Sequence, residues 1–194
     1  MIYLNENIEA LKILINISKN LHRSKKSNYS RIRNNKLFNE KGKDKLINQV
    51  INPLDLALLE IGNEISHFLE TIPIYNIFLR HVNGINLYDS AELICEIKDI
   101  KKFQTSNNLL AYAGIYPNAH NYNKNLHKLL LRISHKLVRY NAVYEFIYSN
   151  AYKKYSLLNT NEEHIEAMAR RIVIKKFLQN LFTHWIKLED DNVN

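Results

Sequence analysis

Residues 79–117 read LRHVNGINLYDSAELICEIKDIKKFQTSNNLLAYAGIYP, and this stretch decides the fold that we predict. The pattern predicts a helix, a tight turn at Asn83-Gly84, a second helix, and a third short helix that ends at a glycine. Asn and Gly favour such a turn because both tolerate a positive φ angle. We expect Asp89 or Ser90 to cap the second helix. Its inward face is predicted from helical spacing to be Ala91, Ile94, Cys95 and Ile97. The first helix is expected to present Ile74, Ile77, Phe78 and Val82.

Two helices joined by a glycine turn, with an apolar residue on each side of the glycine, have the shape of a helix-hairpin-helix unit. In that unit, free backbone N–H groups of the turn and the following helix N-terminus face a DNA phosphate. The pattern therefore predicts DNA contacts at Asn83, Gly84, Ile85 and Asn86. An ordinary αα-hairpin inside a helical core is the alternative that the sequence leaves open.

Several blocks of residues occur in an order typical of one protein family. They are Gly84-Ile85, Ser90-Ala91, Glu96-Ile97, Asp99-Ile100, Phe103, Ser106, residues 110–115, Pro117, residues 124–131 and residues 167–172. This order resembles the carboxy-terminal domain of insertion-sequence transposases that pair a RuvC-like DEDD nuclease domain with a serine domain. These are the bridge-RNA-guided recombinases, which include the pilin-gene invertase. The resemblance implies DNA transposition and recombination.

The chain departs from this family where its chemistry would lie. The resemblance implies a serine nucleophile shortly after the Gly-x-x-Pro turn, but residues 118–124 read NAHNYNK and contain no serine. A cleaving serine needs an exposed hydroxyl beside the scissile phosphate, and Ser134 falls inside a predicted helix. The four acidic residues of the nuclease domain are also missing, and Asn86 stands at the hairpin's second glycine position. We therefore expect no catalytic residue, and a truncated remnant or one piece of a split enzyme.

The formal net charge of +8 is confined to one segment of the chain. Residues 19–45 contain ten Lys or Arg residues and two acids, and the remaining charges sum to zero. This concentration favours a polyanionic partner. Within it, residues 22–45 are interpreted as a basic arm, whose expected DNA-binding cations are Arg23, Lys25, Lys26, Arg31, Arg33 and Lys36. The aromatic rings of Tyr29 and Phe38 can stack on unpaired bases. A solvated linker is the alternative interpretation.

Further helices are predicted on both sides of this organising stretch. Tyr3–Leu21 has helical spacing, and Asn52-Pro53 is expected to open a helix as its N-cap and first residue. Residues 54–72 carry a heptad seam at Leu54, Leu58, Ile61, Ile65, Phe68 and Ile72. Such a seam favours a short coiled coil, through which the chain could form a homo-oligomer, or a two-helix hairpin within one chain.

The carboxy-terminal part is predicted to contain two more helices. One long helix is expected over Lys124–Tyr148, with Val143 and Phe146 among its inward residues and with Lys128 and Arg132 in a basic stripe that can contact DNA. A capping box at Thr160–Glu163 is expected to start the last helix. Its predicted core face is Ile165, Met168, Ile172, Phe177, Leu181 and Trp185.

Composition limits the classes of protein and site. With 4 Gly and 3 Pro in 194 residues, few turns are available for a sheet. The single cysteine, Cys95, excludes an intrachain disulfide and fits a reducing cytoplasm. No run of residues is long and apolar enough for a membrane span. Neither the histidine spacing nor any Gly-rich loop indicates a metal or cofactor site.

We therefore predict an all-α helical bundle with a helix-hairpin-helix-like unit, preceded by a short coiled-coil-like helix. The expected domains are an amino-terminal helix and basic arm at 1–52 and a transposase-like helical domain at 53–190. The expected function is that of a DNA-binding carboxy-terminal portion of a transposase, not catalytic alone, with DNA or structured RNA as its partner. Two alternatives stay open: a recombinase subunit active with a separate nuclease-domain partner, and a helical assembly module without a nucleic-acid role.

Overall fold

The structure is a computed structural model that describes residues 2–116, 121–158 and 161–191. These residues form helices and connecting turns, and no strand occurs among them. The predicted all-α class is therefore confirmed. The chain divides into two compact units, Met1–Thr71 and Ile72–Asn194.

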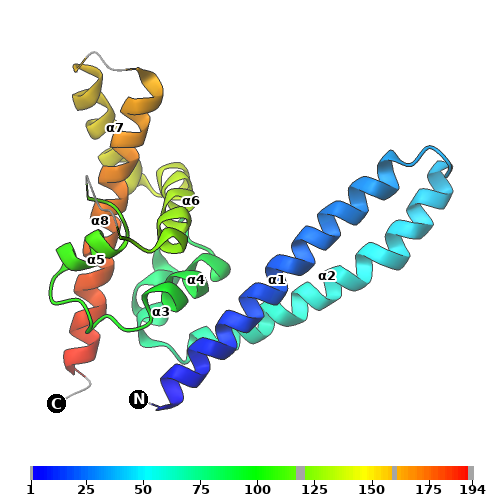
Figure 1. Ribbon diagram of the computed structural model, residues 1–194, viewed down its shortest axis with the longest axis horizontal. Coiled ribbons are helices and arrows are strands. Elements are labelled where there is room, and N and C mark those ends of the chain that lie inside the picture. Colours follow the sequence, from blue (N-terminus) through cyan, green and yellow to red (C-terminus); the bar gives the residue numbers. More distant parts are fainter. Residues whose placement is uncertain (1, 117–120, 159–160, 192–194) are drawn as a thin grey trace. The chain divides into compact units, whose positions relative to one another are not determined.

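The first unit is a hairpin of two long helices, α1 (Ile2–Asn34) and α2 (Glu40–Glu70), which lie side by side in Figure 1. Both helices bury a mainly apolar stripe at their mutual contact. The buried residues are Ile8, Leu11, Ile15 and Ser18 of α1, and Ile51, Leu58, Ile65 and Leu69 of α2. The heptad seam of α2 therefore packs against α1 of the same chain, which is one of the two alternatives predicted for this seam.

Both helices of the hairpin differ in length from the sequence-based prediction. Helix α1 continues past Leu21 to Asn34, because neither Gly nor Pro interrupts the chain before Gly42. Residues 22–34 are therefore helical, and only residues 35–39 connect α1 to α2. The predicted helix start at Asn52-Pro53 is wrong, since α2 begins at Glu40 and Pro53 lies inside it. A boundary between residues 52 and 53 falls within this helix.

The cap of α2 explains why the helix starts so early. Asn39 has an extended backbone, and its side-chain oxygen accepts the N–H of Gly42 at 2.8 Å. This bond satisfies one of the unpaired N–H groups at a helix start. Proline inside a helix removes one backbone hydrogen bond. Burial of Ile51 and Leu58 against α1, on either side of Pro53, holds the helix together through this position.

The second unit is built around its last helix, α8 (Glu162–Asp191), as Figure 1 shows. The preceding elements are α3 (Pro73–Ile77), the 3-10 turn η1 (Leu79–His81), α4 (Leu87–Ile97), α5 (Ser106–Tyr112), α6 (Lys124–Tyr140) and α7 (Ala142–Ser156). Helices α3, α5, α6 and α7 contact α8, and α4 packs on α6. The core of this unit includes the fully buried Phe177, Leu178 and Leu181 of α8.

The long helix expected over Lys124–Tyr148 is in fact two helices. Asn141 has an extended backbone (φ −131°, ψ 111°), ends α6, and caps α7 by accepting the N–H of Val143 at 3.1 Å. The interruption changes the helical phase, so the prediction that Val143 and Phe146 point inward is wrong. Both are 65% exposed, and Tyr144 is buried in their place.

The organising stretch follows its predicted pattern closely after the turn. Ala91, Ile94, Cys95 and Ile97 are all buried, and α5 ends at Tyr112, with Ala113 as its C-cap before Gly114, whose φ is +69°. Before the turn the helix is shorter than expected. Helix α3 spans five residues and η1 three, and Ile77 is 55% exposed.

The predicted cap of the last helix falls partly outside the described residues, because Thr160 is not among them. Asn161 accepts the N–H of His164 at 2.8 Å, so this side chain satisfies an N–H group in the first turn of α8. Of the predicted core face, Met168 and Ile172 are only half-buried, and the other four residues are buried.

Gly84 is required by the packing of the second unit. Its φ is +95°, and a Cβ atom added to it would lie 2.7 Å from the carbonyl oxygen of Lys136 in α6. We expect Gly84→Ala to lower the free energy of unfolding by about 2–4 kcal/mol, from the strained backbone and the overlap together. Urea denaturation followed by circular dichroism measures this loss.

Gly42→Ala is the matched control. Its added Cβ atom would lie 3.2 Å from the side-chain oxygen of Asn39, which can shift. The control should change stability by less than about 1 kcal/mol. Equal stability of the Gly84 variant and the unaltered protein would contradict the packing described for this turn.

Candidate nucleic-acid interface

The turn between η1 and α4 is closed by its own hydrogen bonds. The N–H of Ile85 donates to the carbonyl oxygen of Val82 at 3.1 Å. Asn86 is the N-cap of α4, and its side-chain oxygen accepts the N–H of Asp89 at 2.8 Å. In return, the Asp89 carboxylate accepts the N–H of Asn86 at 3.3 Å. This reciprocal pair is a capping box. The predictions that Asp89 or Ser90 would be the N-cap are therefore wrong, since Asp89 occupies the third helical position.

Asp89 is the buried anion of this region. Its side chain is 1% exposed, and the carboxylate accepts hydrogen bonds from two cations of α6: Lys136 at 2.6 Å and Arg132 at 3.2 Å. A buried carboxylate is costly unless it is paired in this way. The two ion pairs therefore fix α6 against the start of α4.

Arg132 also contacts a second carboxylate. Its guanidinium donates to Glu92 at 3.0 Å, in addition to the contact with Asp89. Desolvation lowers the pKa of Arg132, but Glu92 and Asp89 outweigh it, so that the pKa lies above its ordinary value. An incoming phosphate at this position meets a cation that two carboxylates already neutralise.

The structure brings Arg132 and the predicted turn residues into one region of the second unit. Gly84 faces the carbonyl oxygen of Lys136, one turn of α6 beyond Arg132. The side chains of Asn83 and Asn86 are exposed, whereas Gly84 and Ile85 are half-buried. Anions favour the N-terminus of a helix. At α4 the Asp89 carboxylate already occupies part of that position.

Lys128 lies on α6 one helical turn before Arg132, and residues four apart share a helix face. It is exposed, and no ion pair to it occurs within the described residues. Its ammonium group is therefore available to an anion in solvent. The two predicted cations of α6 thus differ: Arg132 is paired and Lys128 is open.

The predicted cations of the first unit divide in the same way. Within the described part of the chain, Arg23, Lys26, Arg31 and Lys36 are exposed and have no ion-pair partner. Lys25 instead pairs with Asp55 across the hairpin. Arg33 lies 3.4 Å from the carboxylates of Glu40 and Asp44. A hydrogen bond to the Tyr29 hydroxyl contributes most to raising the pKa of Arg33, and the two acids add to it.

The exposed cations have aromatic neighbours in sequence. Tyr29 and Phe38, which the sequence singled out as stacking residues, are 44% and 45% exposed. Arg23 and Lys26 lie three residues apart on α1, a spacing that places both on one side of the helix. This region therefore combines open positive charge with accessible aromatic rings.

The segment expected to lack a nucleophile is only partly described, because residues 117–120 fall outside the described residues. Tyr122 packs over Gly114, where an added Cβ atom would lie 2.5 Å from the tyrosine ring. Asn123 caps α6 by accepting the N–H groups of Asn125 and Leu126 at 3.0 Å. Ser134 is fully buried within α6, and its hydroxyl donates to the carbonyl oxygen of Leu131.

No group of three or more His, Cys, Asp or Glu residues in the described ranges is placed to hold a metal ion. None of the helices described is long and apolar enough to cross a membrane.

Sequence reasoning missed the carboxylate that organises this region. Asp89 was expected only as a cap, and its ion pairs with α6 were not foreseen. One signal was present, since Asn86 and Asp89 are three residues apart in the pattern of a capping box. Pairing with Lys136 depends on how α4 and α6 meet, and helical periodicity alone does not determine such a contact.

Part of the chain is similar to a known protein family. Residues 77–140 match the family described as Transposase IS116/IS110/IS902 family. The matched residues include the turn, the Asp89 ion pairs and all of α6. The match supports a role in transposition and, in general terms, an interaction with nucleic acid. A search of curated proteins found no match.

The ion pairs of Asp89 should stabilise the second unit measurably. Asp89→Ala removes the capping carboxylate and leaves Lys136 and Arg132 without their buried partner. Because both cations are partly exposed, we expect a loss of about 2–3 kcal/mol, below the range for a fully buried pair. Glu92→Ala removes one contact of Arg132 and should cost less than about 1 kcal/mol. Urea denaturation of both variants tests this order, and equal losses would contradict it.

Proposed function

We propose that this chain binds DNA as a carboxy-terminal, non-cleaving portion of an insertion-sequence transposase. The observation that carries the proposal is the confinement of the whole net charge of +8 to residues 19–45. Of the DNA-binding cations predicted in that segment, four are exposed and unpaired among the described residues: Arg23, Lys26, Arg31 and Lys36. The family match over residues 77–140 gives this charge a context in transposition.

Open cations suit a DNA backbone for a physical reason. Each one that neutralises a phosphate releases condensed counterions, and this release drives binding at low salt. A cation that already pairs with a carboxylate contributes less, since the carboxylate must first be displaced. We therefore assign the main contribution to the four open cations. Lys25 and Arg33 pair with acids of α2 and stabilise the hairpin, so they contribute less to phosphate binding.

The second unit provides a smaller contact surface in this proposal. Lys128 contacts phosphate directly, because it is exposed and unpaired within the described residues. Asn83 and Asn86 are exposed on the turn that Gly84 and Ile85 shape, and this turn packs against α6 at Lys136. Arg132 adds to the local positive potential while it keeps α4 and α6 together. Phosphate contacts of this kind position a protein on DNA without reading its sequence.

One feature of the sequence and one of the structure support binding without cleavage. Residues 118–124 contain no serine, and Ser134, the next one along the chain, is fully buried. A buried hydroxyl cannot approach a scissile phosphate. Purified protein incubated with supercoiled DNA and Mg²⁺ should therefore leave the DNA intact.

Assembly with a second copy is a further candidate role, favoured by exposed apolar residues of α2. Leu56 and Leu59 are 63% and 62% exposed and lie outside the contact with α1. Both belong to residues 54–72, the segment for which the sequence left open a homo-oligomer or a two-helix hairpin within one chain. Apolar side chains exposed together on one helix are candidates for a protein contact.

The DNA-binding proposal is tested by a salt series with a triple variant. Arg23→Gln, Lys26→Gln and Arg31→Gln together remove three open cations. Binding to duplex DNA should weaken, and the slope of log affinity against log salt should flatten by about 2–3 because each phosphate contact contributes about 0.9. Fluorescence anisotropy with labelled duplex DNA and structured RNA measures both slopes.

The matched control removes the same net charge elsewhere. Lys153→Gln, Lys154→Gln and Lys187→Gln change three exposed lysines of α7 and α8. This control should keep the slope of the unaltered protein. Equal flattening in both triple variants would mean that binding depends only on net charge, which would contradict the assignment to residues 19–45. No binding at low salt would refute the proposal. Binding to RNA alone would refute DNA as the partner.

A further inference from the structure

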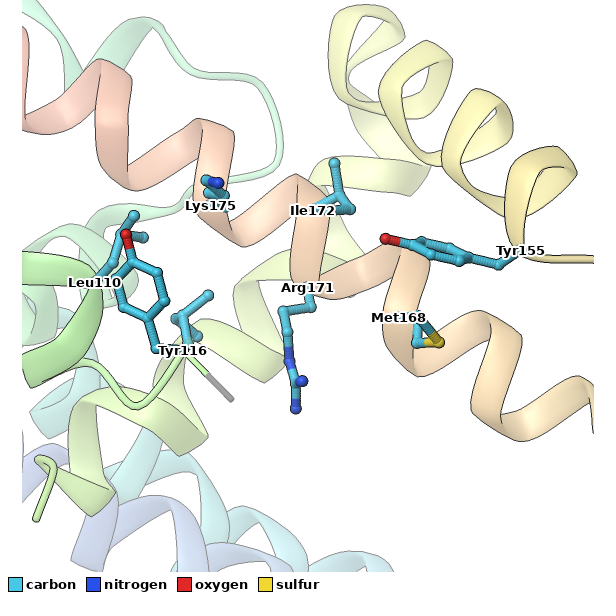
Figure 2. Close-up of a pocket in the computed structure, with 8 residues that line it drawn as sticks. Leu110, Tyr116, Tyr155, Met168, Arg171, Ile172 and Lys175 are labelled. Carbon is cyan, nitrogen blue, oxygen red and sulfur yellow. The ribbon is translucent and has the colours of Figure 1, made fainter. Parts of the chain in front are cut away.

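A cavity of about 240 Å³ lies in the second unit, among α5, α7 and α8. Its wall contains four apolar side chains, two tyrosines and two cations: Leu110, Ile115, Met168, Ile172, Tyr116, Tyr155, Arg171 and Lys175. No carboxylate of a described residue lines it. Figure 2 shows Tyr116 and Tyr155 on either side of the part of α8 that carries Arg171 and Ile172.

The polar groups of this cavity have no partner within the described residues. Arg171 and Lys175 form no ion pair there, although α8 carries acids and Arg170 pairs with Glu166 one turn away. The hydroxyls of Tyr116 and Tyr155 likewise form no hydrogen bond to a described residue. In Figure 2 the guanidinium of Arg171 extends away from α8. A ligand is therefore offered two positive charges and two hydroxyls.

This combination fits a flat apolar ring that carries a negative charge. Pockets for drug-sized ligands measure roughly 300–1,000 Å³, so a smaller cavity suits a single ring system. Aromatic side chains stack on any nucleobase, and arginine pairs with phosphate. The charge of the cavity excludes a cationic occupant and disfavours a purely apolar one.

We propose that this cavity binds one unstacked nucleotide of a DNA strand. The base enters between Tyr116 and Tyr155 onto the apolar floor of Met168 and Ile172, and Arg171 and Lys175 bind its phosphate. The inference rests on the proposed function, since it specifies which feature of DNA the second unit recognises. Unpairing is least costly where a base is already unpaired, so the protein should prefer such sites.

The test compares a fully paired duplex with a duplex that contains one extrahelical 2-aminopurine. We expect about tenfold tighter binding to the second duplex, the effect of one base stacked on an aromatic side chain, and quenching of the 2-aminopurine fluorescence. Tyr155→Leu and Arg171→Gln should each reduce the preference and the quenching. Their matched controls, Tyr140→Leu and Lys176→Gln, change exposed residues outside the cavity and should retain both.

Each result has a separate meaning. Equal affinity for the two duplexes, or a preference that survives in the cavity variants, would overturn the nucleotide site and leave the proposed function standing. Absence of binding to either duplex would contradict both. Circular dichroism of every variant confirms that the helices are intact, and a variant that fails to fold is replaced by Lys175→Gln.

Discussion

The second unit depends on a buried carboxylate that two helices share. Asp89 caps the start of α4, and its remaining charge is neutralised by Lys136 and Arg132 of α6. A buried charge without partners is strongly unfavourable, so α6 must lie against this end of α4. The same contact brings Gly84 against the backbone of α6, where no side chain fits. The turn, the cap and the helix pair therefore form one interdependent structure.

This arrangement separates cations that hold the fold from cations that are open to a ligand. Arg132 and Lys136 stabilise the contact between α4 and α6, whereas Lys128 is exposed and unpaired among the described residues. The first unit shows the same division between Arg33, which pairs with two acids, and Arg23, which pairs with none described. A basic stripe in a sequence thus contains residues of two kinds, and only their acid partners distinguish them.

Periodicity predicted the parts of the fold that depend on local pattern. The buried face of α4 and the glycine after α5 follow from spacing and φ preference alone. Errors arose where a distant contact or a single polar residue decided the outcome. Pro53 stays inside α2 because α1 packs alongside, and Asn141 ends α6 because its side chain caps the next helix. The acid partners of Arg132 lie about 40 residues away and could not be identified from spacing.

Lysine reactivity in the absence and presence of duplex DNA tests most directly whether open cations form the interface. Acetylation of each lysine can be quantified by mass spectrometry. If open cations form the interface, Lys26, Lys36 and Lys128 lose reactivity when DNA binds, and Lys154 does not. Lys136 should react slowly with or without DNA, because Asp89 holds it. Uniform protection of all lysines, or protection confined to Lys154, would contradict an interface made of open cations.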